Sequence, residues 1–231
     1  NVTARMGTPY VKVFEEEREL TVFILADISG SIDGGTRGVS KRDRITELAA
    51  VLAFSAMGNN DKVGAILFSD RIEKFIPPKK GKSHVLRIIR EIIEIEPEGK
   101  GTDITNALDH FLSAMKKRTV SFLLSDFRDS GYEDLLKRAG RKHDFVALKI
   151  EDPIDLDIPD VGWWPLKDHE SGETKWMRTG SKKDRIRYRA REVERSDSLN
   201  RAFARAGIDS TTIRTDQPYV KPLMQLFDRR G

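Results

Sequence analysis

The chain has 231 residues and a mass of 26.3 kDa, with 38% hydrophobic and 34% charged residues and a mean hydropathy of -0.50. This composition is typical of a globular protein with a sizeable core and excludes disorder, collagen and coiled coil. No apolar run approaches the ~20 residues that cross a bilayer, so we expect no membrane span. The absence of cysteine excludes disulfides and cysteine-ligated metals and fits a cytoplasmic location.

Charge is distributed unevenly along the chain, whose net charge is +4. Residues 170–231 contain 15 basic and 9 acidic residues, a net charge of +6, while the part before them carries -2. This excess is smaller than a dedicated nucleic-acid-binding surface requires. We expect a single domain over 1–231, and the start at Asn1, without a signal peptide, suggests a fragment of a longer protein.

Short apolar runs without strict alternation predict strands that are buried on both faces of a parallel sheet. Amphipathic segments between them, with apolar residues three and four apart, predict helices. Strands at 20–26, 63–68, 120–124 and 145–150 therefore alternate with helices at 45–56, 85–93 and 104–115.

Strands that alternate with helices predict an α/β fold with a doubly wound, mostly parallel sheet and helices on both faces. Residues 72–76 follow Phe68 too closely for a crossover, so we expect them to form an antiparallel edge strand. Residues 10–14 are a further strand candidate.

The last third of the chain begins with a turn-rich insertion at about 152–182, which contains Trp163 and Trp164. These tryptophans either cover a sheet edge or form an exposed contact patch for a partner. Helices are predicted at 199–206 and 219–230, and a strand at 210–213. Residues 185–193 alternate like a strand but consist of residues that helices tolerate, and we expect a helix there. The basic residues at 182–195 are typical of a solvated helix face or, less often, of a docking surface.

Oxygen-bearing side chains stand at predicted strand ends or helix starts at three places. Asp27, Ser29 and Ser31 form an Asp-x-Ser-x-Ser pattern after the first strand, Gly101, Thr102 and Asp103 precede a helix, and Ser125 and Asp126 end another strand. The carboxyl ends of parallel strands share one edge of a sheet, where ligands bind. We therefore expect Asp27, Ser29, Ser31, Thr102 and Asp126 to converge there.

These donors suit a hard cation, which we expect to be Mg²⁺, with Mn²⁺ or Ca²⁺ as alternatives. Two carboxylates neutralise the charge of a divalent cation. Because Mg²⁺ takes six ligands and tends to keep waters, we expect at least one position to face solvent and to accept a carboxylate from a partner protein. Asp103, Ser125 and Gly101 would support the ligands. Taken singly, the same residues also suit turns and helix caps.

The order and separation of these residues resemble the metal-ion-dependent adhesion site of von Willebrand factor type A domains. Asp27, Ser29 and Ser31 match its first loop, Thr102 its second and Asp126 its third, although Ile32 stands where methionine often follows the second serine. Over essentially the whole chain, further segments resemble the bacterial domain-of-unknown-function-58 family: Ala4-Arg5, 11–17, 125–127, 142–144, 152–168 and 170–173.

The resemblance implies a von Willebrand factor A-like fold and partnership with a MoxR-type AAA+ ATPase in chaperone-like or assembly work. The sequence predicts a Mg²⁺-dependent protein-binding module rather than an enzyme, with specificity from the loop at 33–42 or from the tryptophans. One alternative is a metal-dependent hydrolase or phosphatase, for which no general base or nucleophile is recognisable. A second is nucleic-acid binding through the basic C-terminal segment.

Overall fold

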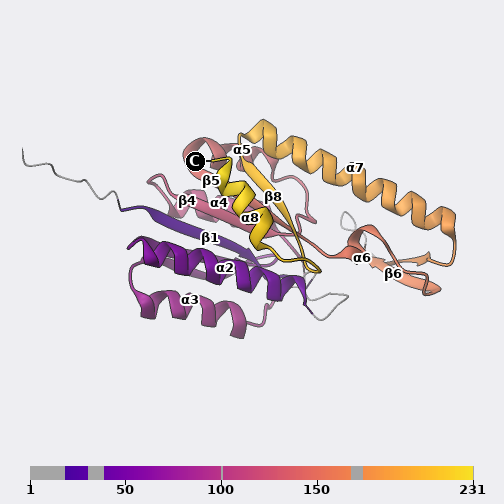
Figure 1. The fold of residues 1–231 in the computed structure, drawn as a ribbon, viewed down its shortest axis with the longest axis horizontal. Helices are drawn as coiled ribbons and strands as arrows, with labels where there is room; N and C mark the ends of the chain where they lie inside the picture. Colours follow the sequence, from indigo (N-terminus) through magenta and orange to yellow (C-terminus); the bar gives the residue numbers. More distant parts are fainter. Residues whose placement is uncertain (1–18, 31–38, 100, 168–173, 231) are drawn as a thin grey trace, which may run out of the picture.

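The computed structural model describes residues 19–30, 39–99, 101–167 and 174–230. Their main feature is a six-stranded sheet with the strand order β3-β2-β1-β4-β5-β8 (Figure 1). All neighbouring strands are parallel except β2 and β3. The six strands are β1 (Thr21–Asp27), β2 (Lys62–Phe68), β3 (Ile72–Lys79), β4 (Val120–Ser125), β5 (Asp144–Glu151) and β8 (Asp209–Arg214).

This sheet confirms the predicted doubly wound α/β fold. The strand at residues 72–76 is antiparallel and lies at one edge, because the short turn after β2 reverses the chain direction. The predicted strand at 210–213 lies within β8 at the opposite edge. The candidate strand at residues 10–14 lies outside the described part of the chain.

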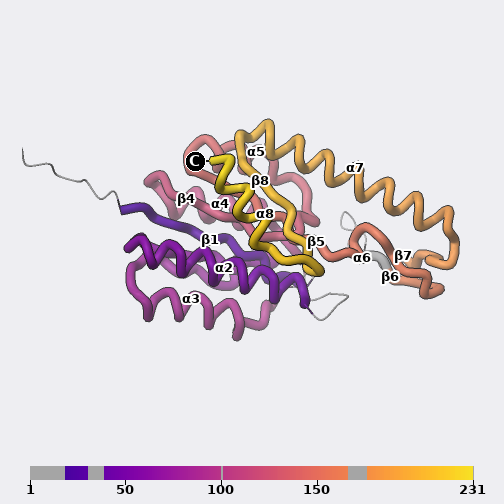
Figure 2. Tube along the Cα trace, viewed as in Figure 1, coloured from indigo at the N-terminus to yellow at the C-terminus, as the bar shows by residue number. Residues whose placement is uncertain are grey.

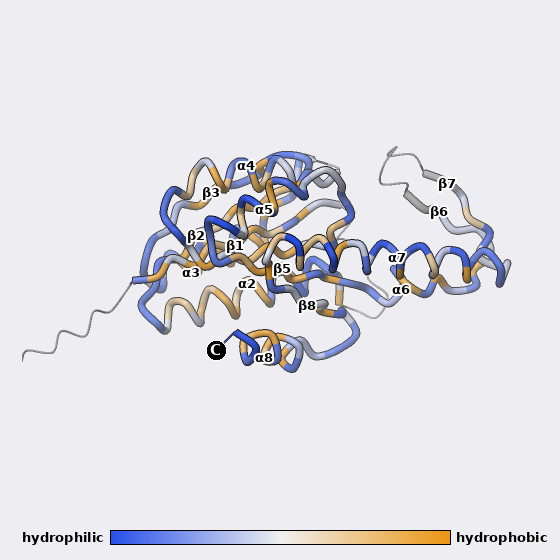
Figure 3. The backbone as a smooth tube through the Cα atoms, turned by 90° about the horizontal axis from the view of Figure 1, so that it is seen from above, coloured by the Kyte–Doolittle hydropathy of each residue, from blue (hydrophilic) through white to orange (hydrophobic). Residues whose placement is uncertain are grey.

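Helices cover both faces of the sheet, and the sheet separates two clusters of buried core residues (Figure 3). On one face, Ile45, Ile88 and Leu226 contribute to a cluster from α2, α3 and α8. On the other, Phe111, Leu136 and Phe203 contribute from α4, α5 and α7. The bounds are α2 (Lys41–Gly58), α3 (Lys82–Glu94), α4 (Ile104–Ala114), α5 (Glu133–Lys142), α7 (Lys182–Ala206) and α8 (Val220–Asp228).

Local capping fixes where the helices that flank the site begin. Ser40 accepts a hydrogen bond from the amide of Asp43, and the Asp43 carboxylate accepts one from the amide of Ser40, which completes a capping box at the start of α2. Asp103 caps α4 by accepting from the amide of Asn106, at 2.7 Å. Asp103 is therefore the N-cap of α4.

The insertion at 152–182 contains more regular structure than its turn-rich sequence suggests. It holds the short helix α6 (Pro153–Leu156) and an antiparallel hairpin of β6 (Trp163–Lys167) and β7 (Thr174–Arg178). The two helices predicted at 185–193 and 199–206 form one continuous helix, α7, which has 25 residues. Figure 2 shows that α7 extends beyond the sheet and that the hairpin lies at its far end. We call α6, the hairpin and the first half of α7 the arm.

Among the described residues, no helix is both long enough and apolar enough to cross a membrane.

Candidate metal centre

Asp27 is the last residue of β1, and its carboxylate is fully buried at the carboxyl edge of the sheet. One carboxylate oxygen, Oδ1, accepts a hydrogen bond from the amide of Ser29 at 3.0 Å. The other, Oδ2, accepts from the hydroxyl of Ser125 at 2.6 Å. The contact joins the ends of β1 and β4, which are neighbours in the sheet.

Thr102 joins this cluster from the loop before α4. Its hydroxyl donates a hydrogen bond to the hydroxyl oxygen of Ser29 at 2.7 Å, although 73 residues separate the two in sequence. The amide of Asp103 donates to the carbonyl of Ser69 at 2.8 Å, which attaches the loop to the end of β2. The loops that carry Ser29 and Thr102 thus meet at one edge of the sheet, as the sequence predicts.

Asp126 follows β4 and is also buried, and the side chains of Lys41 and Arg128 place two positive charges within 4 Å of its carboxylate. Its Oδ2 lies 3.0 Å from the ammonium nitrogen of Lys41, the first residue of α2. Its Oδ1 accepts from the amide of Arg128 at 3.1 Å. The carboxylate of Asp126, one of the predicted metal ligands, therefore already has a positive charge beside it.

The basic partners of Asp126 belong to a larger network that reaches the arm. Lys41 also lies 2.9 Å from Asp155 of α6. The Arg128 guanidinium lies 3.1 Å from Asp155 and 3.3 Å from Glu192 of α7. Mostly buried ion pairs thus link Asp126 at the edge of the sheet, through Lys41 and Arg128, to the acidic residues of the arm.

The environments of the two carboxylates differ, and so do their pKa values. Burial, together with the nearby negative charge of Asp126, raises the pKa of Asp27 from 3.8 to about 7. Burial would also raise the pKa of Asp126, but the positive charges of Lys41 and Arg128 outweigh it and hold that pKa below its ordinary value. Without a further cation, Asp27 is the less favourable place for a negative charge.

The donor chemistry fits a hard cation. Adjacent oxygens around an octahedral Mg²⁺ with bonds of about 2.1 Å lie about 3.0 Å apart, close to the 2.7 Å between the hydroxyl oxygens of Ser29 and Thr102. Asp27 would add a carboxylate oxygen. Among the residues that the structure describes, no three His, Cys, Asp or Glu side chains form a metal cluster. A metal here would depend on hydroxyl oxygens and two carboxylates.

Comparison with known proteins identifies the family. The family described as "Protein of unknown function DUF58" matches residues 1–198. The chain belongs to the DUF58 family. Its mostly parallel α/β sheet is the architecture that the sequence resemblance implies.

Relatives of this DUF58 chain include the "Uncharacterized protein Rv1480" of Mycobacterium tuberculosis, which is 27% identical over 99% of this chain and 73% of that protein. Solved structures that share the fold include the following two. BatB from Bacteroides thetaiotaomicron has a TM-score of 0.57 and 19% identity over 91% of this chain and 98% of that one. An aerotolerance-related membrane protein from Bacteroides fragilis, with multiple mutations to serines, has a TM-score of 0.58 and 18% identity over 91% and 99%.

The remaining predicted residues of this DUF58 chain differ in how they relate to the cluster. Ser125 contacts Asp27 directly, as described above. The amide of Gly101 donates to Asp70 at 3.3 Å, so it contacts the turn after β2 rather than Asp27. Asp103 acts as a helix cap. Ser31 lies outside the described residues, as does most of the loop at 33–42.

The two tryptophans predicted as partner contacts lie in the hairpin of this DUF58 chain, on strand β6 rather than on a turn. Trp163 is 64% exposed, and Trp164 is half-buried. Because they are neighbours on one strand, they point to opposite faces of the hairpin. Only Trp163 of the pair belongs to a freely exposed surface.

Sequence analysis missed Lys41, Arg128, Asp155 and Glu192. The signal that could have suggested two of them is position: Arg128 comes two residues after Asp126, and Lys41 opens the helix that follows the first loop. Nothing in the sequence pairs either residue with Asp126. The contact between Lys41 and Asp126 exists because α2 and β4 are brought together at one edge of the sheet.

Proposed function

We propose that this chain is a Mg²⁺-dependent protein-interaction module. In this proposal Asp27, Ser29 and Thr102 bind the cation at the edge of the sheet, with Ser31 and Asp126 as further ligands. When bound, Mg²⁺ would supply an open coordination position for an Asp or Glu side chain of a partner protein. The proposal includes no enzymatic activity.

The convergence of Asp27, Ser29 and Thr102 is the observation that carries this proposal. Two separate loops bring the hydroxyls of Ser29 and Thr102 within 2.7 Å of each other, beside a buried carboxylate. Burying such a carboxylate is costly unless a positive charge accompanies it. A divalent cation would supply that charge and would relieve the repulsion between Asp27 and Asp126.

Each protein side chain has a separate part in this function. Asp27 contributes charge and is held in one orientation by Ser125 and by the amide of Ser29. The neutral hydroxyls of Ser29 and Thr102 contribute oxygen ligands without further negative charge. Because the site is partly buried, a carboxylate from the partner would bind more strongly than one in an exposed ion pair.

We also propose a MoxR-type AAA+ ATPase as the partner, in chaperone-like or assembly work, and a cytoplasmic location. The partner rests on membership of the DUF58 family, and the location rests on the absence of cysteine. One structural neighbour is described as a membrane protein, so cell fractionation is the direct measurement of location.

Isothermal titration of the chain with MgCl₂ tests the metal site. We expect one site in the wild type, loss of binding in Asp27→Ala, and weaker binding in Thr102→Val, which removes one hydroxyl. Asp209→Ala is the matched control. Asp209 is the first residue of β8, so it lies at the amino ends of the parallel strands, away from the site at their carboxyl ends, and it pairs with Arg230. Identical isotherms for the wild type and Asp27→Ala would refute the proposal.

A binding experiment with the purified candidate ATPase tests the partner. We expect association in Mg²⁺, loss of association in EDTA, and loss in Asp27→Ala but not in Asp209→Ala. Association that persists in EDTA would contradict metal-dependent binding even if the ATPase is the correct partner.

A further inference from the structure

One face of the arm hairpin is exposed and aromatic. In the register of β6 and β7, Trp163 lies opposite Arg178, and Pro165 lies opposite Trp176. Since side chains alternate along a strand, these four residues share one face. All four are exposed, and each tryptophan is 64% exposed. The described residues therefore leave this aromatic face uncovered.

The first half of α7 is strongly basic. Residues 182–191 contain six basic residues and one acidic residue. Lys183, Arg187 and Arg191 are exposed and lie four residues apart, so they form a row along one side of the helix. Two described acidic residues nearby pair with other arginines: Asp160 with Arg185 and Asp157 with Arg189. The row has no ion-pair partner among the described residues.

Exposed aliphatic side chains lie beside this basic row. Ile186 is 60% exposed and Val193 is 46% exposed. Their spacing of seven residues places them on one side of α7, next to the row. The outward surface of α7 thus combines cations with apolar groups.

The aromatic face and the basic row are close along the chain. The hairpin is closed at its base by Thr179, whose amide and hydroxyl both donate to the carbonyl of Gly162, at 2.6 and 3.0 Å. Ser181 then caps α7 by accepting from the amide of Asp184. The chain between the tryptophans and the row is short, and it carries two further basic residues, Arg178 and Lys182.

We propose that the arm binds an anionic phospholipid surface, with Trp163 and Trp176 at the level of the headgroups and the basic row against their phosphates. Indole rings favour the interface between water and hydrocarbon, because they combine an apolar ring with a polar N–H. Lysine and arginine bury their apolar stems while their charges remain at the headgroups. The arm would bind to the surface without crossing the bilayer.

The observations favour a lipid surface over two other polyanions. A single-stranded nucleic acid would use the tryptophans and arginines, but the exposed Ile186 and Val193 offer nothing to stacked bases. An acidic protein would be expected to bury its main contacts in packed pockets. Trp163 and Trp176 instead lie on the open face of a two-stranded hairpin.

Intrinsic fluorescence of the full chain tests the proposal, because all three tryptophans lie in the hairpin. The chain is titrated in EDTA with vesicles of phosphatidylcholine alone or with phosphatidylglycerol at about 2:1. We expect a shift of the emission to shorter wavelength and co-sedimentation only with the anionic vesicles, and loss of both at high salt. Because EDTA removes any metal, the result is independent of the proposed Mg²⁺ site.

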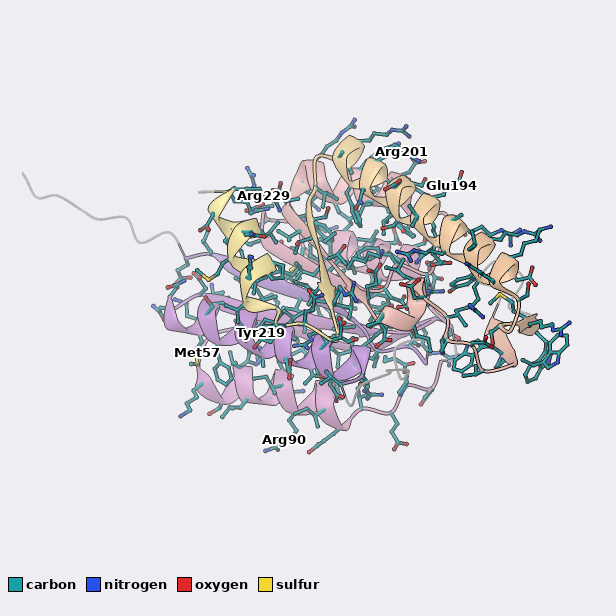
Figure 4. All side chains as sticks on the ribbon, turned by 45° about the vertical axis from the view of Figure 1, so that its right-hand side comes forward. Met57, Arg90, Glu194, Arg201, Tyr219 and Arg229 are labelled. Carbon is teal, nitrogen blue, oxygen red and sulfur yellow. The ribbon has the colours of Figure 1, made fainter. Side chains whose placement is uncertain are left out.

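Variants assign the binding to the arm. Each basic residue at an anionic surface accounts for about fivefold in affinity, so Lys183→Gln with Arg187→Gln is expected to weaken binding by about 30-fold. Trp163→Ser with Trp176→Ser should abolish the spectral shift. The matched control is Arg201→Gln with Arg205→Gln, which removes the same charge from the other half of α7 and should bind normally (Figure 4).

Three results would overturn the proposal. The first is equal binding to neutral and anionic vesicles, and the second is equal weakening by the Arg201 and Arg205 control. The third is a spectral shift with a single-stranded oligonucleotide or with polyglutamate but not with anionic vesicles, which would assign the surface to nucleic acid or to an acidic protein.

Discussion

The ammonium group of Lys41 lies 3.0 Å from the carboxylate of Asp126, and both side chains are buried. The two residues are 85 positions apart in sequence, at the start of α2 and just after β4. This pair places a protein cation on one of the carboxylates predicted to bind metal. Any metal ion that binds Asp126 therefore competes with Lys41.

Replacing Lys41 with methionine should tighten Mg²⁺ binding and destabilise the metal-free protein. Removal of one partner from a buried ion pair costs about 3–5 kcal/mol, and we expect the lower end because Arg128 remains 3.8 Å from Asp126. Loss of a positive charge beside the site should strengthen Mg²⁺ binding by about tenfold. Urea denaturation and titration calorimetry measure the two effects.

Lys62→Met is the matched control for this prediction, because Lys62 pairs with the exposed Glu19 away from the site. It should change neither the stability nor the Mg²⁺ affinity appreciably. Unchanged Mg²⁺ affinity in Lys41→Met would mean that Lys41 does not compete with the metal.

Asp27→Asn should stabilise the metal-free protein at alkaline pH while it removes metal binding. The pKa of Asp27 is about 7 in the folded protein, against 3.8 ordinarily, so the folded state holds its proton more tightly. Wild-type stability should therefore fall as pH rises from about 4 to 7. The neutral amide avoids this loss, and we expect a gain of about 1–3 kcal/mol at pH 8.

Thermal unfolding of the wild type and Asp27→Asn at pH 5 and pH 8, with and without Mg²⁺, measures both effects: the gain in stability and the loss of metal binding. Saturating Mg²⁺ should raise the stability of the wild type but not that of Asp27→Asn. A variant less stable than the wild type at pH 8 without metal would show that the buried charge of Asp27 is not unfavourable.

His143 should make the protein less stable below pH 6.5. Its ring is buried against Phe111, with 4.6 Å between ring centroids, and its Nδ1 lies 2.9 Å from the hydroxyl oxygen of Thr119. Burial, with the charges of Lys142 and Arg118, lowers its pKa from 6.5 to about 4. Between pH 6.5 and pH 4 the unfolded chain therefore binds a proton that the folded protein does not bind. This difference lowers the free energy of unfolding by about 3 kcal/mol once the pH is below 4.

Urea denaturation between pH 7.5 and pH 5 measures this effect, preferably in the Asp27→Asn variant, where the opposing contribution of Asp27 is absent. His143→Phe should reduce the decline in stability as pH falls. An unchanged pH profile in His143→Phe would assign the decline to other groups.

Gly140→Ala should loosen the packing of α5 against the end of α7 and the residues just after it. A Cβ at this position would lie 2.5 Å from the carbonyl oxygen of Ala206 and 2.9 Å from the Ile208 side chain. Such a contact forces a backbone shift, and we expect a cost of about 1–3 kcal/mol. The control is Gly58→Ala at the end of α2, where nothing lies within 4 Å; its melting temperature should stay the same or rise, and an equal loss in both variants would contradict the packing argument.

The sequence predicted the sheet well, because uninterrupted apolar runs such as 63–68 are typical of strands covered on both faces. It also predicted that Ser29 and Thr102 meet, since the loops after parallel strands and before the following helices lie along the same edge of the sheet. It was less informative for the arm. The turn residues at 152–182 gave no indication of the hairpin, because the pairing of β6 with β7 depends on contacts between strands and not on local sequence pattern.

The amino-acid order by itself determined the α/β class, the antiparallel edge strand and the places of Asp27, Thr102 and Asp126 at strand ends or before a helix, because periodicity and motif spacing are local properties. Only the tertiary structure decided that Lys41 contacts Asp126, that Arg128 links the sheet edge to α6 and α7, and that Trp163 and Trp176 share an open face. The physical reason is that ion pairs and strand register join residues distant in sequence, and such pairings leave no periodic signal in one chain.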